Sequence, residues 1–279
     1  MSRTATGRDW TLEDIPWDIF DAQKVDPDIL KLVKAASLVE YNGGDYATYL
    51  CNVFRGDHEF QAAARAWADE EVKHGCALGR WAEMADDSFD FEESFQRFVE
   101  GFRLPLDAAR SVRGSRSGEL VARCMVEIGT SSYYTALAEA AEEPVLRAIC
   151  SKIAGDEFRH YKLFYSYLNR YLEREGMGRL RRALVALGRV RESEDDELAY
   201  AYYAANGEGE AYDRERCSHA YLQRTCAFYR SRHLRRMVVM SFKTAGLSPR
   251  GRLAEWAWRF LSWRLRHRHQ MAKMTNEAA

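Results

Sequence analysis

Apolar residues recur three and four positions apart along most of the chain, the spacing that places them on one face of an α-helix. This pattern predicts long helices at about 28–55, 58–85, 117–142 and 144–175. It predicts less regular helices at about 178–204, 209–245 and 252–272. The chain is therefore expected to adopt an all-α fold.

Turn signals group the four long helices into two pairs. Asp26 precedes Pro27, which suits the first position of the first helix. The segment 55–57 contains Gly56 and separates the first two long helices, with Asp57 placed to cap the second; residues 142–144 end in Pro144 and separate the other two. Each pair is expected to form a helical hairpin, and the roughly thirty residues at 86–116 suit a crossover along a four-helix bundle.

The predicted organisation has three parts. Residues 1–27 form an aromatic and acidic leader, residues 28–175 the four-helix bundle, and residues 176–279 additional helices that pack on it. The last part ends in a basic tail rich in tryptophan and arginine. Its possible partners are an anionic membrane, nucleic acid or an acidic carrier protein, but packing against the bundle is the favoured use and nucleic-acid binding is not expected.

Two Glu-x-x-His patterns, at Glu71–His74 and Glu157–His160, are the only ones in the chain. Residues three apart on a helix share a face, so the carboxylate and the imidazole of each pattern can bind the same ion. Both patterns lie in the second helix of a predicted hairpin.

A glutamate in the first helix of each hairpin precedes its pattern by a nearly constant interval. Glu40 lies 31 residues before Glu71, and Glu127 lies 30 residues before Glu157. Within each hairpin the two glutamates lie at about the same distance from the turn that joins their helices. At 1.5 Å per residue this distance is roughly 20 Å. Six side chains are therefore predicted to meet at one height in the bundle: Glu40, Glu71, His74, Glu127, Glu157 and His160.

Four carboxylates buried together repel one another and take up protons unless cations neutralise them. Two divalent ions balance four carboxylates, and oxygen-rich sites with one imidazole per metal suit iron or manganese better than structural zinc. The alternative is that these are surface glutamates and hydrogen-bonded core histidines. The joint pattern of order, spacing and turns favours the metal site.

The segments RAWADEEVKHG at 65–75 and AICSKIAGDEFRH at 148–160 resemble the second- and fourth-helix motifs of the soluble acyl-carrier-protein desaturases, within the ferritin-like superfamily. The resemblance covers about residues 30–170. It implies that Glu71 and Glu157 are terminal or bridging ligands, that both histidines are ligands, and that Glu40 and Glu127 are the single carboxylates of their helices.

The resemblance also implies roles beside the ligands. Thr130 matches a catalytic hydroxyl at the oxygen-binding face, whereas its counterpart after Glu40 is Gly43, which would make the pocket asymmetric. Asp156 matches a carboxylate that orients a ligand histidine.

Gly43 and Gly44 lower the stability of the first helix. Three reasons for these glycines stay open: they make room for oxygen or substrate, they form a bulge in the helix, or they allow close packing against another helix. The tyrosines near the ligands suit either an electron route or, more commonly, core packing; these are Tyr46, Tyr133, Tyr134, Tyr161 and Tyr165.

Composition indicates the class of protein and the compartment in which it works. With 47% hydrophobic and 30% charged residues the chain is expected to be globular. Six cysteines without a Cys-x-x-Cys pattern exclude a rubredoxin-type iron site and a zinc ribbon, and indicate a reducing compartment. The polar N-terminus and the lack of a run long enough to cross a bilayer predict a cytoplasmic protein.

These observations favour an O2-activating, non-haem di-iron oxidase of desaturase or hydroxylase type. Its cofactor would be two iron ions, with manganese as the alternative. Its expected substrate is a small organic molecule, with an acyl chain as one candidate, and its expected partners are a ferredoxin-like electron donor and an acyl carrier protein. By resemblance it would form a homodimer. Two other functions stay open, namely ferroxidase or peroxide-scavenging activity, and a structural metal site with a partner-binding tail.

Overall fold

The computed structural model describes residues 10–192, 196–207 and 209–277, with all their side chains except those of residues 192 and 268–277. Within these ranges the chain is helical and contains no β-strand, as the periodicity predicts. The α-helices are α1 Pro27–Tyr41, α2 Gly43–Val53, α3 His58–Ala85, α4 Phe91–Gly101, α5 Arg116–Ala140, α6 Pro144–Glu175, α7 Arg179–Glu192, α8 Asp196–Asn206, α9 Arg214–Phe228, α10 Ser231–Thr244 and α11 Arg252–Glu277.

Helices α3 and α6 span the residues that the sequence predicts, and polar side chains cap their first turns. The Asp57 side chain accepts a hydrogen bond from the backbone N–H of Phe60 at 3.1 Å. At the start of α6 the Glu143 carboxylate accepts the N–H groups of Val145 and Leu146, and Pro144 occupies the first turn. These caps satisfy donors that a helix start would otherwise leave unpaired.

The single helix predicted at 28–55 is wrong in one respect, since the chain breaks at Asn42 into α1 and α2. The break brings the start of α2 against α3. A Cβ atom on Gly43 would lie 2.7 Å from the Glu71 Cβ and 3.1 Å from the Ala68 carbonyl oxygen. Close helix packing therefore requires glycine at position 43, whereas a Cβ on Gly44 would meet nothing within 4 Å.

Three other boundaries differ from the prediction. The crossover contains helix α4, which was not predicted. The helix expected at 178–204 is two helices, α7 and α8, and residues 193–195 between them lie outside the described chain. The helix expected at 209–245 divides into α9 and α10, because Tyr229 and Arg230 are extended and the Arg230 N–H donates to the His233 side chain.

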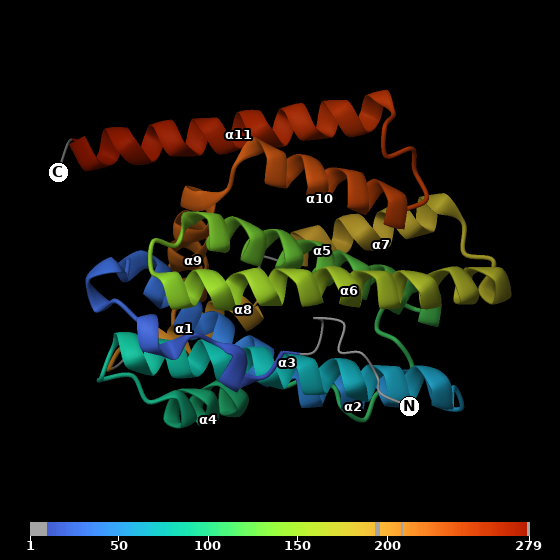
Figure 1. The fold of residues 1–279 in the computed structure, drawn as a ribbon. Helices are drawn as coiled ribbons and strands as arrows, with labels where there is room; N and C mark the ends of the chain where they lie inside the picture. Colours follow the sequence, from blue (N-terminus) through green and yellow to red (C-terminus); the bar gives the residue numbers. More distant parts are fainter. Residues whose placement is uncertain (1–9, 193–195, 208, 278–279) are drawn as a thin grey trace, which may run out of the picture.

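Two helical pairs form the centre of the molecule: α1 and α2 pack on α3, α5 packs on α6, and the pairs meet where α3 faces α6 (Figure 1). The C-terminal helices add to this centre. Helices α7 and α10 pack on α5, α8 and α9 pack on α1, and α11 rests on α10 and α9. In Figure 1, α11 crosses the top of the molecule and α4 lies at the bottom.

The hydrophobic core is divided into two clusters along these helices. One cluster takes most of α1, the end of α3, the end of α5 and the start of α6, and contains Leu38, Trp81 and Leu137. The other takes α2, the start of α3, the start of α5 and the end of α6, and contains Leu50, Phe60 and Phe164. The positions between the clusters fall near the middle of α3, α5 and α6 and at the end of α1, where the six polar residues of the sequence pattern lie.

The described part of the predicted leader, from Trp10 onward, consists of three short 3-10 turns, Leu12–Asp14, Trp17–Ile19 and Ala22–Lys24. Trp10 and Ile15 are buried in the first core cluster. Residues 1–9 of the leader lie outside the described residues.

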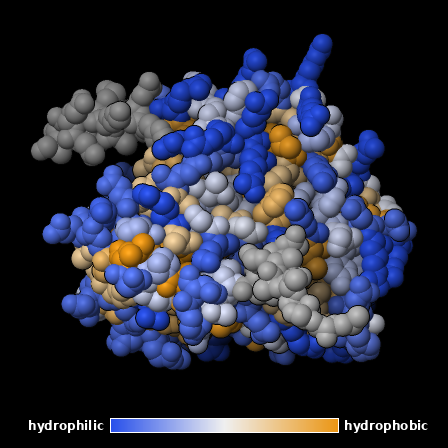
Figure 2. Space-filling model, in the orientation of Figure 1, coloured by the Kyte–Doolittle hydropathy of each residue, from blue (hydrophilic) through white to orange (hydrophobic). Residues whose placement is uncertain are grey.

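The tail helix α11 buries Ala254, Ser262 and Leu265 but exposes Trp256, Phe260 and Trp263. Two of its predicted basic side chains, Arg268 and Lys273, lie outside the described side chains. Hydrophilic side chains dominate the upper edge of the molecule, where α11 lies, in Figure 2. No described helix is both long and apolar enough to span a membrane.

Candidate metal centre

The structure brings together the six side chains singled out by their spacing. They extend inward from α1, α3, α5 and α6 at the level between the two core clusters. Each keeps between 0% and 6% of its surface exposed. Such burial is unusual for carboxylates and requires a compensating partner.

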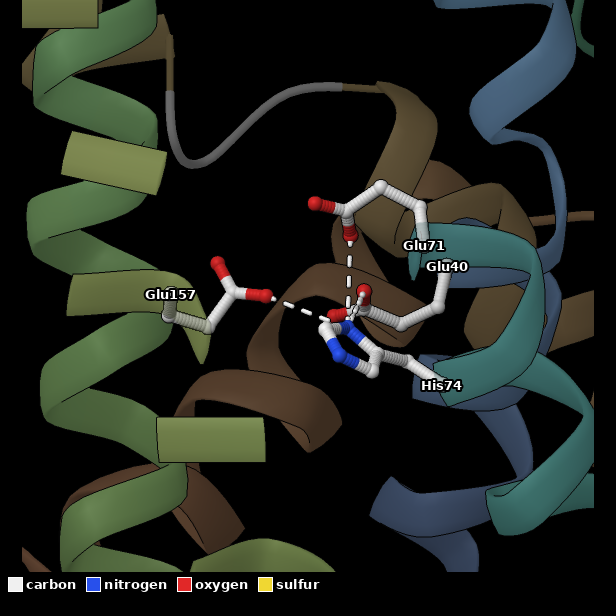
Figure 3. Close-up of side chains that lie close together, drawn as sticks. All are labelled: Glu40, Glu71, His74 and Glu157. Carbon is white, nitrogen blue, oxygen red and sulfur yellow. Dashed lines mark ion pairs between the residues drawn. The ribbon is translucent and has the colours of Figure 1, made fainter. Parts of the chain in front are cut away.

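The six residues form two overlapping groups of four, in each of which one donor atom per residue lies within 4.8 Å of the others. The first group, shown in Figure 3, is Glu40, Glu71, His74 and Glu157. The second group is Glu71, Glu127, Glu157 and His160. Glu71 and Glu157 belong to both groups, so these two carboxylates could bridge two ions, with one further carboxylate and one imidazole for each ion.

Each histidine turns its Nδ1 atom toward these carboxylates. The His74 Nδ1 lies 3.3 Å from Glu157 Oε1, 3.5 Å from Glu40 Oε2 and 3.7 Å from Glu71 Oε2. The His160 Nδ1 lies 2.9 Å from Glu71 Oε1, and between 3.7 and 3.8 Å from carboxylate oxygens of Glu157 and Glu127. The same nitrogen of both imidazoles is therefore available to an ion.

Several of these buried atoms have no hydrogen-bond partner among the described residues: Glu71 Oε1, His74 Nδ1, both carboxylate oxygens of Glu127, Glu157 Oε1 and His160 Nδ1. Leaving a buried polar atom unpaired costs about 1–3 kcal/mol, and more for a charged group. Here they cluster, and all belong to residue types that bind divalent metals. The donor set thus fits a pair of metal ions.

The pKa values of the clustered groups also indicate a site for cations. Burial, followed by the charges of neighbouring carboxylates, raises the pKa of Glu40 and Glu127 well above the usual range. Burial lowers the pKa of His74 and His160, but contacts with the surrounding carboxylates outweigh it and raise both values. Without a cation the cluster therefore balances its charge by holding protons, which metal ions would displace.

The other ring nitrogen of each histidine contacts a second carboxylate outside the cluster. The His74 Nε2 lies 3.0 Å from Asp156 Oδ2, and the His160 Nε2 lies 3.2 Å from Glu70 Oε2. The resemblance to the desaturases implies this role for Asp156 but not for Glu70. The signal was present, because an acidic residue directly precedes the glutamate of both Glu-x-x-His patterns.

These two outer carboxylates are themselves held in place. The Arg159 Nη2 lies 3.0 Å from Glu70 Oε2 and 2.8 Å from Asp156 Oδ1, which connects α3 to α6. The Trp10 indole N–H donates to Asp156 Oδ2 at 2.7 Å, and its ring stacks on His74 with a centroid separation of 5.9 Å. The leader thus closes the histidine side of the centre, a role the sequence did not indicate for Trp10.

A small chamber of about 60 Å³ lies on another side of the cluster. Its lining includes all four carboxylates but neither histidine. Gly43 and Thr130 both contribute to its wall, and the Thr130 hydroxyl donates to Glu157 Oε2. The chamber is large enough for a water molecule or O2 and has the asymmetric wall that the sequence comparison indicated.

The tyrosines near the centre have different surroundings. Tyr134 donates its hydroxyl to Glu40 Oε1 at 2.6 Å and so orients that carboxylate. Tyr46 donates to Glu197 at the wall of the chamber. Tyr133 and Tyr161 pack in the two core clusters, with Tyr165 beside Tyr161.

A cavity of about 1150 Å³ lies between α5 and the C-terminal helices and shares several lining residues with this chamber, among them Glu40 and Thr130. It reaches Glu40 and Thr130 at one end, and side chains such as Leu187, Met237 and Phe260 line it elsewhere. Its volume exceeds the roughly 300–1,000 Å³ usual for small-molecule sites. The arrangement offers an extended apolar ligand access to the carboxylate cluster.

Residues 52–187 match the family described as fatty acid desaturase. The matched segment contains five of the six clustered residues and begins after Glu40. No curated protein matches the chain. The match supports a desaturase-like oxidoreductase. Helices α8–α11 lie outside the matched segment, although they form much of the cavity wall.

Proposed function

We propose that this protein is an O2-activating di-iron oxidase with a ferritin-like four-helix centre, acting on an unactivated C–H bond of an acyl or other extended organic substrate. The observation that carries the proposal is the position of the carboxylate cluster, which lines a small chamber beside a large apolar cavity. The desaturase family match agrees with it.

In this proposal Glu40 and His74 serve one iron ion, Glu127 and His160 serve the other, and Glu71 and Glu157 are shared. Two iron ions held here would supply the activation of O2 and the oxidising power to break a C–H bond. Manganese is the alternative ion, because the same donors suit it.

The protein's own groups prepare the site for that chemistry. Asp156 and Glu70 hold the imidazoles so that Nδ1 faces inward, as outer carboxylates commonly do in metal centres. The Thr130 hydroxyl keeps a proton at the chamber wall beside Glu157, and we assign it as the candidate catalytic residue. The mostly apolar lining of the cavity favours the hydrocarbon chain of a substrate over water.

The reaction also requires partners. Both desaturation and hydroxylation with O2 need two electrons and two protons from outside the substrate, which a ferredoxin-like donor would supply. An acyl carrier protein would be a partner if the substrate is an acyl thioester, whereas a free acid needs none. A homodimer formed through the first hairpin and a cytoplasmic location complete the proposal, and no role with nucleic acid is included.

The test is an assay of the iron-loaded, reduced protein with O2 and a mixture of fatty acids and acyl thioesters. The proposal predicts substrate-dependent O2 consumption and a desaturated or hydroxylated product by mass spectrometry. Glu127→Ala should abolish the product while the far-ultraviolet circular dichroism stays unchanged. An iron-loaded wild-type protein that consumes no O2 beyond the oxidation of its own iron would reject the proposal.

The same experiment separates the two other functions. A ferroxidase or peroxide scavenger needs no organic ligand, so the apolar cavity favours the oxidase. A purely structural metal site predicts that Glu127→Ala lowers stability without removing any turnover.

A further inference from the structure

A buried arginine lies where the chamber and the cavity meet. Arg123 is on α5, one helical turn before Glu127, and only 7% of its surface is exposed. It lines both the chamber beside the carboxylates and the large apolar cavity. A ligand that extends from the cavity to the metal centre must pass it.

The Arg123 guanidinium has no hydrogen-bond or ion-pair partner among the residues that the structure describes. Its contacts are with two aromatic rings, Tyr46 at 4.9 Å and Trp67 at 5.4 Å from the ring centroids. A guanidinium keeps its charge at any physiological pH and carries five N–H donors. Burying such a group without a hydrogen-bonded anion is unfavourable, so an anion that enters beside Arg123 would stabilise it.

Among the described residues no carboxylate accepts a hydrogen bond from Arg123, although the Arg123 charge acts to lower the pKa of Glu127. Glu127 belongs to the carboxylate cluster, and the Glu197 carboxylate accepts the hydroxyl of Tyr46. Arg189, which lines the same chamber, adds a second positive charge. The surroundings of Arg123 therefore favour an anionic group that arrives with the ligand.

We propose that Arg123 binds the carboxylate of the substrate, so that the substrate is a free, unesterified carboxylic acid with its apolar chain in the cavity. The binding site does not depend on the proposed oxidase function. Only the position at which the substrate is oxidised rests on that function. A planar guanidinium and a carboxylate can form two parallel hydrogen bonds, a geometry that an alcohol or an ester cannot reproduce.

The position of Arg123 also determines which carbons are oxidised. Along α5 the four residues from Arg123 to Glu127 span about 6 Å. A carboxylate held at Arg123 therefore places the first few carbons of the chain beside the cluster, and the distant end of the chain in the cavity between α7, α10 and α11.

The binding test compares three ligands that share one chain and differ in head group: dodecanoate, dodecan-1-ol and dodecyltrimethylammonium. Titration calorimetry of the full-length protein should rank dodecanoate first and the ammonium ion last. Arg123→Gln should weaken dodecanoate binding by about 30-fold or more, the loss expected for one partner of a buried charge pair. It should change dodecan-1-ol binding by less than about threefold.

A matched control is Arg80→Gln. Arg80 also lies over an aromatic ring, Trp17, at 4.2 Å, but it does not line the cavity. Its substitution should leave the binding of all three ligands unchanged. Equal effects of Arg123→Gln on dodecanoate and dodecan-1-ol, or no effect on either, would overturn the inference.

If Arg123→Gln does not fold, the wild-type protein and Arg123→Lys still decide the question. The wild type must prefer dodecanoate to dodecan-1-ol, and Arg123→Lys must retain part of that preference because it keeps the charge but loses the planar fork. A wild type that binds both ligands equally well would overturn the inference without any variant.

Product analysis then tests the consequence for the reaction. With a free fatty acid the iron-loaded enzyme should oxidise carbons near the carboxyl end, as fragmentation mass spectrometry would show. Oxidation confined to the middle of the chain would overturn the placement. Charge-selective binding without any turnover would instead reject the oxidase function while leaving the carboxylate site intact.

Discussion

The Nε2 atom of His74 lies 3.0 Å from the carboxylate of Asp156, although the two residues are 82 positions apart and on different helical pairs. His160 and Glu70 repeat this contact in the opposite direction between the same two helices, α6 and α3. Each helix therefore carries, side by side, a ligand candidate for the cluster and the carboxylate that orients the imidazole of its neighbour.

This reciprocal arrangement predicts the effect of removing one outer carboxylate. Asp156→Asn and Glu70→Gln should each lower metal affinity by about 10–100-fold, because the imidazole loses the group that fixes its ring and its tautomer. Competition with a metal-indicator dye measures this directly. Gln96→Leu, which breaks an exposed contact with Glu92 away from the cluster, is the control and should change nothing.

The two adjacent glycines give a second prediction with a built-in control. Gly43→Ala places a Cβ 2.7 Å from the Glu71 Cβ, so it should destabilise the protein by about 1–3 kcal/mol and displace the Glu71 carboxylate. Gly44→Ala meets nothing within 4 Å and should stabilise helix α2 by up to about 1 kcal/mol. Urea unfolding and metal content measure both effects. Equal behaviour of the two variants would contradict the packing described here.

Metal removal should lower thermal stability. A ligand present at about 100 times its Kd stabilises the native state by about 2.7 kcal/mol. For a chain of this size that corresponds to a fall in Tm of about 5–10 °C on chelation. Glu71→Ala, which lacks a shared carboxylate, should show no response to the chelator. A wild-type Tm that is the same with and without metal would contradict a metal-binding cluster.

The ion pair of Lys34 and Asp86 predicts how stability depends on pH. The Lys34 Nζ lies 2.6 Å from Asp86 Oδ2 and, with Ser88, lowers the pKa of Asp86 to about 2. The unfolded value is about 3.9, so the stabilisation is complete above that pH and is lost as the pH falls toward 2. Because Asp86 is partly exposed, the gain should be at most about 1 kcal/mol.

The variant Lys34→Met isolates this contribution. The difference in the free energy of unfolding between the wild type and this variant should be largest near neutral pH and should shrink between pH 4 and pH 2 in urea titrations. A difference that stays constant across that range would show that the ion pair does not hold the end of α3 against α1.

The sequence predicted the fold where local chemistry marks the ends of helices. Helices α3 and α6 begin at capping side chains and Pro144, signals that act within one turn and can be read without tertiary structure. The grouping of the six polar residues followed from counting residues back to the turns. Both arguments depend only on the regular rise of a helix.

The missed features depend on contacts between distant segments. The break at Asn42 is set by the approach of α2 to α3 at Gly43, and the apolar pattern continues on both sides of it. The separation of α9 from α10 at Tyr229 has neither glycine nor proline to mark it. Glu70 contacts His160, and Trp10 contacts Asp156. Both contacts join segments that are far apart in the sequence, so local patterns do not reveal them.

We propose that six side chains hold two metal ions, with Glu71 and Glu157 shared between them. The most direct test is an anaerobic titration of the metal-free protein with Fe(II), with bound iron counted per chain. We expect two ions for the wild type, about one for Glu40→Ala and none for Glu71→Ala, each protein remaining folded. A folded wild-type protein that binds no iron, or a Glu71→Ala variant that still binds two ions, would contradict it.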